Sequence, residues 1–411
     1  MITVSCIGCG LRGQRYLKGL SDLGSNKVEI VSLCDKNLTR LHQEQDKYHL
    51  PDKNVFTDED EFFATLKSDL CIVSTQDQDH VNHAIKAMEA GSDVLCEKPI
   101  SNKESELRKL LAVQKKTGKK VMICHVLRFA PAFKKIKSLI DSGTIANLVF
   151  IDSIENVYYA HQAHSFVRGN WRRKEETSPM IIAKCCHDLD LLVWYSNSEC
   201  QSISSVGDLK FFKEENQPKG ASDRCMNCKY RGSCPFDAYT IYIKHQGGGR
   251  EAVTNIRPIT DEILYKELET SPYGRCVFKC DNDVVDHELT QIVFKNGVKA
   301  NLRMIGLTYD YGRIMKFYGT AGQIDLDECR GTIEIKVFGK KIEVIQISSL
   351  VDAVSGHGGG DAGLVKAVYE YITTGFTEGV TSLDASIESH LMGFSAEESR
   401  LQGGKLLEVK H

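Results

Sequence analysis

A glycine-rich turn near the start of the chain constrains the fold more than any other stretch. The apolar segment 1–7 runs into Gly8-Cys9-Gly10-Leu11-Arg12-Gly13, and a helical pattern continues through Leu20. In a strand–turn–helix unit of this kind the first glycine permits the tight turn, the second lets a pyrophosphate approach the backbone, and the third lets helix and strand pack closely. The N-terminus of the helix then faces the phosphates, so the sequence predicts a dinucleotide site. Its expected residues here are Gly8, Gly10, Leu11, Arg12 and Gly13.

The residue that ends the second predicted strand bears on which dinucleotide is bound. The strand pattern 28–34 stops at Asp35. A carboxylate there can accept hydrogen bonds from the ribose hydroxyls and would repel a 2′-phosphate. We therefore expect Asp35 and Lys36 to contact the cofactor and the cofactor to be NAD, with NADP as the alternative because Lys36 is basic.

Helix and strand patterns alternate over the first third of the chain. This alternation predicts βαβ units and a Rossmann-type, doubly wound parallel sheet over residues 1–124. The carboxyl ends of such strands meet at one edge, so Ser74-Thr75 and Glu97-Lys98 should lie beside the glycine turn. Further helices are expected at 38–49, 79–90 and 104–116, and further strands at 70–74, around Val94 and at 121–124.

The turn Glu97-Lys98-Pro99 closes one of these strands. Proline lacks an N–H and disfavours the helical region for the residue before it, so the strand must end there and present Lys98 at its carboxyl end. Ligands bind at that edge of an open parallel sheet. Lys98 could polarise a substrate oxygen or shuttle its proton, with Glu97 holding it. A solvated ion pair at the end of a strand is the alternative interpretation.

Three stretches together resemble the Gfo/Idh/MocA (glucose–fructose oxidoreductase, inositol dehydrogenase) family. They are Ser74-Thr75-Gln76-Asp77-Gln78-Asp79-His80, the segment 84–91, and Val94-Leu95-Cys96-Glu97-Lys98-Pro99, within a pattern that covers 1–131. The resemblance implies that Lys98 reaches both the nicotinamide ribose and the substrate. It also implies that Ser74, Thr75 and His80 flank the cofactor and that Glu97 lies near the nicotinamide ribose. A histidine at a helix N-terminus without any role is the alternative for His80.

After a helix predicted over 132–141, strand patterns dominate from Leu148 to about residue 350. Asn296-Gly297 between two of them is a strong hairpin signal. We expect residues 125–411 to form an α+β domain with a large, mostly antiparallel open sheet that carries substrate groups, as the resemblance also implies. A final helix at about 384–400 should pack back near the first domain. Broad sheets of this kind often pair face to face, so we expect a homo-oligomer formed through this sheet.

A helix predicted over 178–194 carries the second catalytic candidate. Lys184, His187 and Asp188 fall at i, i+3 and i+4 beside its apolar face. His187 titrates near neutrality and could take a hydroxyl proton while hydride leaves the carbon. A core histidine is the alternative, but the resemblance places this histidine opposite the nicotinamide. Many members of the family carry an aspartate four residues before it, where this chain has Ala183.

Lys184, next to that missing acid, has two interpretations. It could take a proton-handling or substrate-binding role in a cluster with Lys98 and His187, where mutual repulsion would lower the pKa of the lysines. It could instead pair with Asp188 on the helix surface. Further candidates for a polyol pocket are Arg128, Glu155, Trp171, Arg172, Arg313 and, from the glycine-rich loop 355–361, His357 with Asp361. A linker with a helix cap at Asp361 is the alternative for that loop.

The spacing Cys225-x2-Cys228-x5-Cys234 is typical of metal sites. Cys276 could supply a fourth thiolate for a tetrahedral structural zinc. The surrounding segment, 213–249, is polar, rich in glycine and poor in periodicity. An insertion of this kind needs a cross-link such as a structural metal to be stable. Free thiols are the alternative, and an iron–sulfur cluster is disfavoured because nothing else in the sequence suggests electron transfer.

Composition limits the class of partner. The 411 residues carry 52 basic and 55 acidic side chains, a net charge of −3, which argues against nucleic acid or an anionic membrane. We find no basic leader and no apolar run of the ~18 residues that a membrane span requires. A cytoplasmic protein with a small-molecule substrate is therefore expected, and the family resemblance implies that this substrate is a sugar or polyol.

These features predict an NAD(P)-dependent dehydrogenase. It would transfer hydride between a nicotinamide cofactor and a hydroxyl or keto carbon of a sugar, inositol or related polyol, with Lys98, His187 and Lys184 at the reacting centre. Two alternatives stay open, each from the resemblance. One is a glycoside hydrolase that keeps its NAD and works by transient oxidation and elimination, and the other is a non-catalytic dinucleotide-binding regulator.

Overall fold

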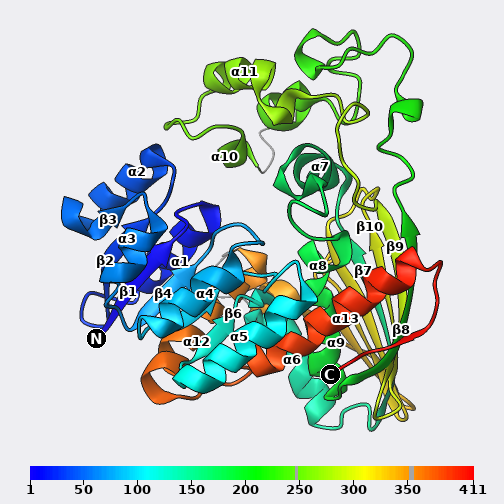
Figure 1. The fold of residues 1–411 in the computed structure, drawn as a ribbon. Coiled ribbons are helices and arrows are strands. Elements are labelled where there is room, and N and C mark those ends of the chain that lie inside the picture. Colours follow the sequence, from blue (N-terminus) through cyan, green and yellow to red (C-terminus); the bar gives the residue numbers. More distant parts are fainter. Residues whose placement is uncertain (246–248, 351–355) are drawn as a thin grey trace.

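Six parallel strands form the first sheet, in the order β3-β2-β1-β4-β5-β6 (Figure 1). The computed structural model describes residues 1–245, 249–350 and 356–411. The strand order reverses between β1 and β4, and ligands of such sheets bind at that point, outside the carboxyl ends of the strands. The strands are β1 (Ile2–Ile7), β2 (Val28–Cys34), β3 (Val55–Phe56), β4 (Leu70–Val73), β5 (Asp93–Cys96) and β6 (Val121–Ile123), and the helices are α1 (Leu11–Ser21), α2 (Leu38–Tyr48), α3 (Glu59–Thr65), α4 (His80–Glu89) and α5 (Glu104–Thr117). The predicted doubly wound sheet is confirmed.

Nine strands form the second sheet, in the order β14-β13-β12-β11-β7-β10-β9-β8-β15. The pair β7–β10 is parallel and the other recorded neighbours are antiparallel. Gly297, with φ +90°, makes the predicted turn between β9 and β10. The strands are β7 (Leu148–Asn156), β8 (Cys200–Asp208), β9 (His287–Phe294), β10 (Lys299–Ile305), β11 (Gly312–Gly319), β12 (Gly322–Asp327), β13 (Thr332–Val337), β14 (Glu343–Gln346) and β15 (Leu407–Glu408). The mostly antiparallel open sheet is therefore also confirmed.

Helices connect the two sheets. α6 (Pro131–Asp141) follows the first sheet, and α12 (Gly360–Thr374) returns to pack against α1. α13 (Leu383–Leu401) packs against β8 of the second sheet and against the helix α9 (Cys186–Ser196). It also packs against α5 and against β6 of the first sheet. It lies between the sheets in Figure 1. The edges of both sheets that matter for ligands are thereby held in a fixed relation.

The helix predicted over 178–194 is broken. α8 (Met180–Ala183) and α9 (Cys186–Ser196) are separated by Lys184 and Cys185. In a continuous helix the carbonyl of Ala183 would accept a hydrogen bond from the N–H of His187. Here Lys98 Nζ donates to that carbonyl at 3.0 Å. A contact from the first sheet thus takes the place of an intrahelical bond, and His187 lies in the first turn of α9.

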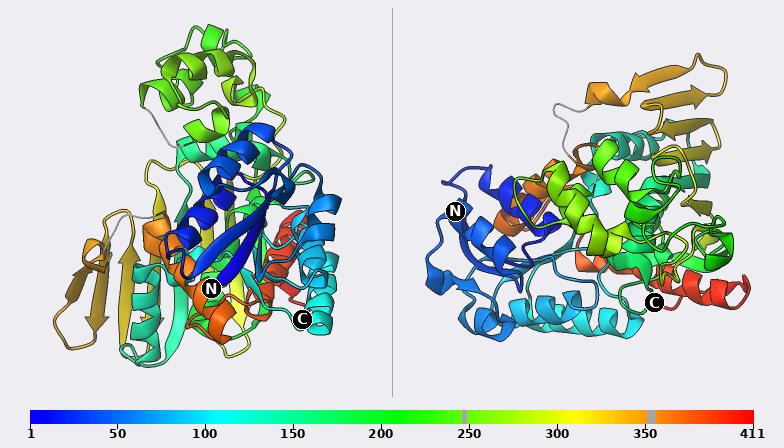
Figure 2. Two further views of the ribbon diagram at one scale, coloured as in Figure 1. Left: turned by 90° about the vertical axis from the view of Figure 1, so that its left-hand side faces the viewer. Right: turned by 90° about the horizontal axis from the view of Figure 1, so that it is seen from above.

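Residues 209–245 and 249–286, between β8 and β9, form a lobe that stands above both sheets in Figure 1 and in the left view of Figure 2. It contains the short helices α10 (Arg250–Val253) and α11 (Asp261–Thr270) and has two small apolar clusters separate from the main core. Arg40 of α2 donates to Asn255 Oδ1 at 3.0 Å, so the lobe also contacts the first sheet's domain. Among the described residues, no helix is long and apolar enough to cross a membrane.

Candidate active site

The three glycines of the turn after β1 each have a separate structural task. Gly8 has φ +90°, which only glycine adopts readily. A Cβ on Gly13 would lie 2.2 Å from the carbonyl oxygen of Gly8, so α1 packs too closely on β1 for any larger residue. A Cβ on Gly10 would meet only the guanidinium of Arg40, at 3.7 Å. The outer side of Gly10 is therefore open, and these residues fit the pyrophosphate of a dinucleotide.

Asp35 follows β2 and holds this turn in place. One carboxylate oxygen accepts the N–H of Cys9 at 2.7 Å and the other accepts the N–H of Asn37 at 2.7 Å. Each oxygen keeps a lone pair for a ligand hydroxyl. Lys36 is largely exposed, and its Nζ lies 3.9 Å from Glu59 Oε2. Its contact with the cofactor stays a prediction.

The residues after β4 connect the strand ends to each other. Ser74 Oγ donates to the carbonyl of Gly8 at 2.7 Å, and Thr75 Oγ1 lies 3.0 Å from His83 Nδ1. His80 is buried, with its ring nitrogens 2.7 Å from the carbonyl of Pro99 and 3.2 Å from that of Thr75. His80 therefore ties the two turns together, and a contact between it and the cofactor stays a prediction.

Glu97 is buried and is bound by protein groups on several sides. Its carboxylate accepts hydrogen bonds from Arg12 Nε at 2.7 Å, from the hydroxyl of Tyr16 at 2.5 Å and from the N–H of Lys98 at 2.8 Å. Burial alone would raise the pKa of Glu97, but Arg12 and Lys98 lower it below its usual value. Glu97 thus acts as an anionic anchor for the lysine turn. Sequence patterns did not predict the hydrogen bond from Tyr16 to Glu97.

Lys98 follows β5 of the first sheet, and His187 lies in the first turn of α9. Lys98 is half-buried and reaches from the end of β5 to the carbonyl of Ala183. His187 is 6% exposed, and within the described part of the chain its Nδ1 is buried without a hydrogen-bond partner. Burial, followed by the charge of Lys98 and the ring of His125, holds the pKa of His187 well below its usual range. The imidazole is therefore neutral at pH 7, and the expectation that His187 titrates near neutrality is wrong because burial and the neighbouring charges disfavour its protonated form.

Lys184 belongs to a buried network of charges rather than to a helix-surface pair. Lys184 Nζ lies 3.1 Å from Glu155 Oε1, and Glu155 Oε2 lies 2.8 Å from Arg313. Arg313 in turn donates twice to Asp188, at 2.7 and 3.1 Å. The expected pair between Lys184 and Asp188 is therefore wrong, because β7 and β11 bring Glu155 and Arg313 between them.

The same network also shows that the expected lowering of the pKa of Lys184 is wrong. Burial acts to lower the pKa of Lys184, but the charges of Glu155 and Tyr311 raise it, and the result is above the usual value. Lys184 is consequently a fixed cation. A proton-handling role for it would need a lowered pKa, whereas a role in binding or positioning does not.

His357 lies beside His187, with 6.2 Å between the ring centroids. Its Nδ1 is 3.2 Å from both carboxylate oxygens of Asp361. Asp361 also accepts from Arg12 at 3.0 Å and from Arg15 at 2.9 Å. Two arginines of α1 therefore hold this glycine-rich loop against the edge of the first sheet. Ser355, at the start of the predicted loop, lies outside the described residues.

Two predicted substrate residues have their guanidinium groups fully engaged elsewhere. Arg128 makes two 2.7 Å hydrogen bonds to Asp190 and borders a separate cavity of about 470 Å³ between α5, α9 and α13. Arg172 donates to both oxygens of Asp281 in the lobe, at 2.9 and 3.1 Å. The structure brings neither of them to His187, so their contact with substrate stays a prediction.

Three further polar residues border the site, although sequence patterns did not single them out. Asp77 is buried, accepts from Trp171 Nε1 at 3.4 Å and from Ser178 at 3.2 Å, and its pKa is raised by burial. The ring of His125 lies 5.7 Å from that of His187. Burial and the nearby charge of Lys184 lower the pKa of His161. Asp77 lies within the motif after β4, but His125 and His161 stand in segments without periodicity.

Comparisons with known proteins extend these observations. Residues 2–125 match a family model described as an oxidoreductase family with an NAD-binding Rossmann fold, and residues 133–325 match the GFO/IDH/MocA C-terminal domain. A putative oxidoreductase, YteT, from Bacillus subtilis is 24% identical over 390 residues, 88% of this chain and 87% of the relative. Inositol 2-dehydrogenase from Salmonella typhimurium is 25% identical over 198 residues, 48% of this chain and 55% of that enzyme. The structure of a levoglucosan dehydrogenase with NADH and levoglucosan has a TM-score of 0.73 at 14% identity, with both chains fully covered.

Proposed function

Because the chain belongs to the GFO/IDH/MocA family of NAD-binding oxidoreductases, we propose that it is a dehydrogenase of a sugar, inositol or related polyol. The reaction would move a hydride between the nicotinamide cofactor and a hydroxyl or keto carbon. One observation carries the proposal: Lys98, at the cofactor edge of the first sheet, reaches the carbonyl of Ala183, four residues before His187. The names of the relatives support the substrate class, since they include an inositol 2-dehydrogenase and a levoglucosan dehydrogenase.

The first sheet provides the residues that would hold the cofactor. Gly8 and Gly13 shape the turn and Gly10 leaves its outer side open for the pyrophosphate. Asp35 offers lone pairs to ribose hydroxyls, which favours NAD over NADP. When bound, the nicotinamide supplies a hydride acceptor or donor. Ser74 and Glu97 complete the edge by fixing the glycine turn and the lysine turn.

His187 and Lys98 would manage the hydroxyl proton. The neutral imidazole of His187 accepts that proton as the carbon is oxidised, and the ammonium group of Lys98 stabilises the developing charge on oxygen. Arg313, bonded twice to Asp188, fixes the first turn of α9 and hence the ring beside it. Lys184 and Glu155 complete the floor of the site, where we place Lys184 in substrate binding rather than in proton transfer.

The large sheet is also the proposed surface for self-association. Apolar side chains on its strands are exposed, among them Val149, Leu289 and Val344. An apolar sheet face of this kind is typically covered by a second copy of the same chain. Sedimentation velocity of the purified protein tests this: a sedimenting species of monomer mass at micromolar concentration would exclude it.

A panel of sugars and polyols, each with NAD and with NADP, tests the proposed function. Nicotinamide absorbance and product analysis are measured together, because a dehydrogenase produces NADH whereas a hydrolase with retained NAD releases glycoside products without net NADH. Lys98→Met and His187→Asn should each lower kcat by roughly 10²–10⁴-fold. Lys341→Met, at an exposed position, is the matched control. Full activity in the Lys98 and His187 variants would refute the assignment, and no turnover of any compound would favour the regulator.

A further inference from the structure

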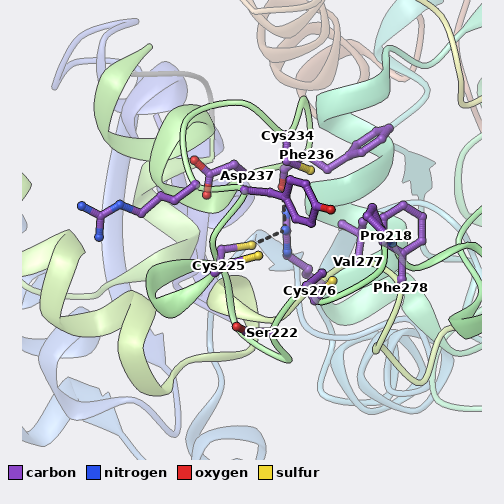
Figure 3. A pocket seen from close by; sticks show the side chains of 14 residues that line it. Pro218, Ser222, Cys225, Cys234, Phe236, Asp237, Cys276, Val277 and Phe278 are labelled. Carbon is purple, nitrogen blue, oxygen red and sulfur yellow. Dashed lines mark hydrogen bonds between the residues drawn. The ribbon is translucent and has the colours of Figure 1, made fainter.

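Four cysteines from two distant segments line one small cavity in the lobe. Cys225, Cys228, Cys234 and Cys276 border a space of about 30 Å³, and all four are free thiols. In Figure 3 the labelled cysteines, Cys225, Cys234 and Cys276, lie on different sides of the pocket. The two segments are held next to each other by their backbones. Arg224 and Arg275 form an isolated antiparallel β-bridge, and the N–H of Cys276 donates to the carbonyl of Asp223 at 2.8 Å. The thiols therefore converge because of the backbone and not through a chance rotamer.

Arg168 places a charge in the same cavity. Its side chain is completely buried; Nη2 donates to Cys225 Sγ at 3.3 Å and to the carbonyl of Phe236 at 2.7 Å, and Nε donates to the carbonyl of Arg275 at 2.7 Å. Nη1 is buried without a partner among the described residues. Within the same residues no carboxylate forms an ion pair with Arg168; Asp237 also lines the cavity, but it accepts hydrogen bonds from the N–H of Gly232 and the hydroxyl of Thr240. A buried guanidinium without an ion-pair partner costs several kcal/mol, so negative charge on the thiols of this cavity would stabilise Arg168.

The lobe also lacks a core large enough to order it. Its apolar residues fall into two small clusters, and much of 209–239 consists of turns. Small units of this kind usually depend on disulfides or a structural metal. The thiols lie in one cavity, yet they are not joined in pairs.

We propose that Cys225, Cys228, Cys234 and Cys276 bind a metal centre as thiolates and that Arg168 neutralises its negative charge. Four thiolates around a divalent ion, or around an iron–sulfur core, carry a net negative charge, which would serve as the counter-charge of Arg168. The centre is structural: it joins the two halves of the lobe and holds the segment 162–168, which leads back to the active-site wall at His161.

The spacing of the sulfurs distinguishes two forms of this centre. A zinc ion with Zn–S bonds of about 2.3 Å would hold its sulfurs about 3.8 Å apart. In the part of the chain that the structure describes, the group of three ligand atoms within 4.8 Å of one another is Asp208, Asp286 and His287, not the cysteines. The thiols therefore either close around one ion or surround a wider cluster containing sulfide.

Metal analysis of the full-length protein tests the proposal. The protein is produced with both zinc and iron in the medium and purified without oxygen or chelator, and its zinc, iron and acid-labile sulfide are measured. We expect about one zinc per chain, or iron with matching sulfide. Only traces of both metals, with no uptake of zinc or of iron and sulfide by the reduced protein, would overturn the proposal.

Variants locate the metal. Cys225→Ser and Cys234→Ser should lose most of it and make 209–286 more sensitive to limited proteolysis, whereas Cys329→Ser, at an exposed cysteine outside the cavity, should keep it. If the Ser variants do not fold, thiol titration of the native protein before and after chelation gives the same information, because release of the metal should expose these four thiols. Equal metal in the Cys225 and Cys329 variants, or no newly reactive thiols, would refute the site. The outcome does not depend on the proposed dehydrogenase activity.

Discussion

The ion pair between Lys184 and Glu155 offers a quantitative test of how the site is built. The two atoms are 3.1 Å apart, and the side chains are 12% and 1% exposed. At an effective dielectric constant of about 20 the Coulomb energy at that distance is about 5 kcal/mol. Much of this is offset by desolvation, but a variant that removes one partner leaves the other charged and buried, at a cost of roughly 3–5 kcal/mol.

A double-mutant cycle measures the coupling. Lys184→Met and Glu155→Gln should each lower the free energy of unfolding by several kcal/mol. The double variant should lose less than the sum, with a coupling of roughly 2–3 kcal/mol. Urea denaturation followed by tryptophan fluorescence gives the three differences. Additivity to within about 0.5 kcal/mol would refute the pairing.

The pH dependence of that coupling separates a fixed cation from a proton carrier. The pKa of Glu155 is lowered from 4.5, because the charges of Arg313 and Lys184 outweigh burial, so its contribution is present above that value and is lost as the pH falls. The pKa of Lys184 is raised from 10.5, so its contribution is lost only as the pH rises beyond that value. The coupling should therefore be constant from about pH 6 to 9. A decline between pH 7 and 9 would instead show a lysine with a lowered pKa and restore its proposed role as a base.

Further variants test the fold and the cofactor site. Gly13→Ala should abolish NAD binding and lower the unfolding temperature, because its Cβ would lie 2.2 Å from the oxygen of Gly8; unchanged binding by calorimetry would contradict the close packing of α1 on β1. Asp35→Ser should reduce the preference for NAD over NADP, and unchanged kcat/KM ratios would remove Asp35 from the argument. Burial raises the pKa of Glu288 from 4.5 to about 7 against the opposing hydrogen bond from Ser205, so its protonated form stabilises the fold and stability is lost as the pH rises through that interval. Glu288→Gln should therefore gain roughly 2–3 kcal/mol more at pH 8 than at pH 5, and equal gains at both pH values would refute the raised pKa.

Local patterns were sufficient for the first sheet and for its ligand edge. The tasks of Gly8 and Gly13 follow from backbone sterics, and the end of β5 follows from Pro99, so neighbours in sequence decide both. The order of strands in the second sheet is different, because its parallel pair β7–β10 joins residues about 150 positions apart. Alternation within one strand does not specify such a partner.

The second half of the site depends on contacts that periodicity does not encode. Apolar spacing predicted one helix over 178–194, but a lysine from the other sheet occupies the carbonyl of Ala183 and the helix divides there. Glu155, Lys184 and Arg313 come from three elements, and their ion pairs appear only after β7 and β11 are placed side by side. Position 183 lacks the acid that many members of the family carry, and its backbone carbonyl accepts the hydrogen bond from Lys98.

The hydrogen bond between Arg40 and Asn255 has a kinetic consequence for whatever binds at Gly10. The guanidinium of Arg40 lies beside the open side of that glycine, and its other contact belongs to the lobe. A dinucleotide seated on the turn would thus be bordered by a segment anchored more than two hundred residues away. Movement of the lobe would then contribute to the rate at which such a dinucleotide is released. Two proteins with the same glycine turn and the same affinity can therefore differ in whether NAD behaves as an exchanging substrate or as a retained prosthetic group.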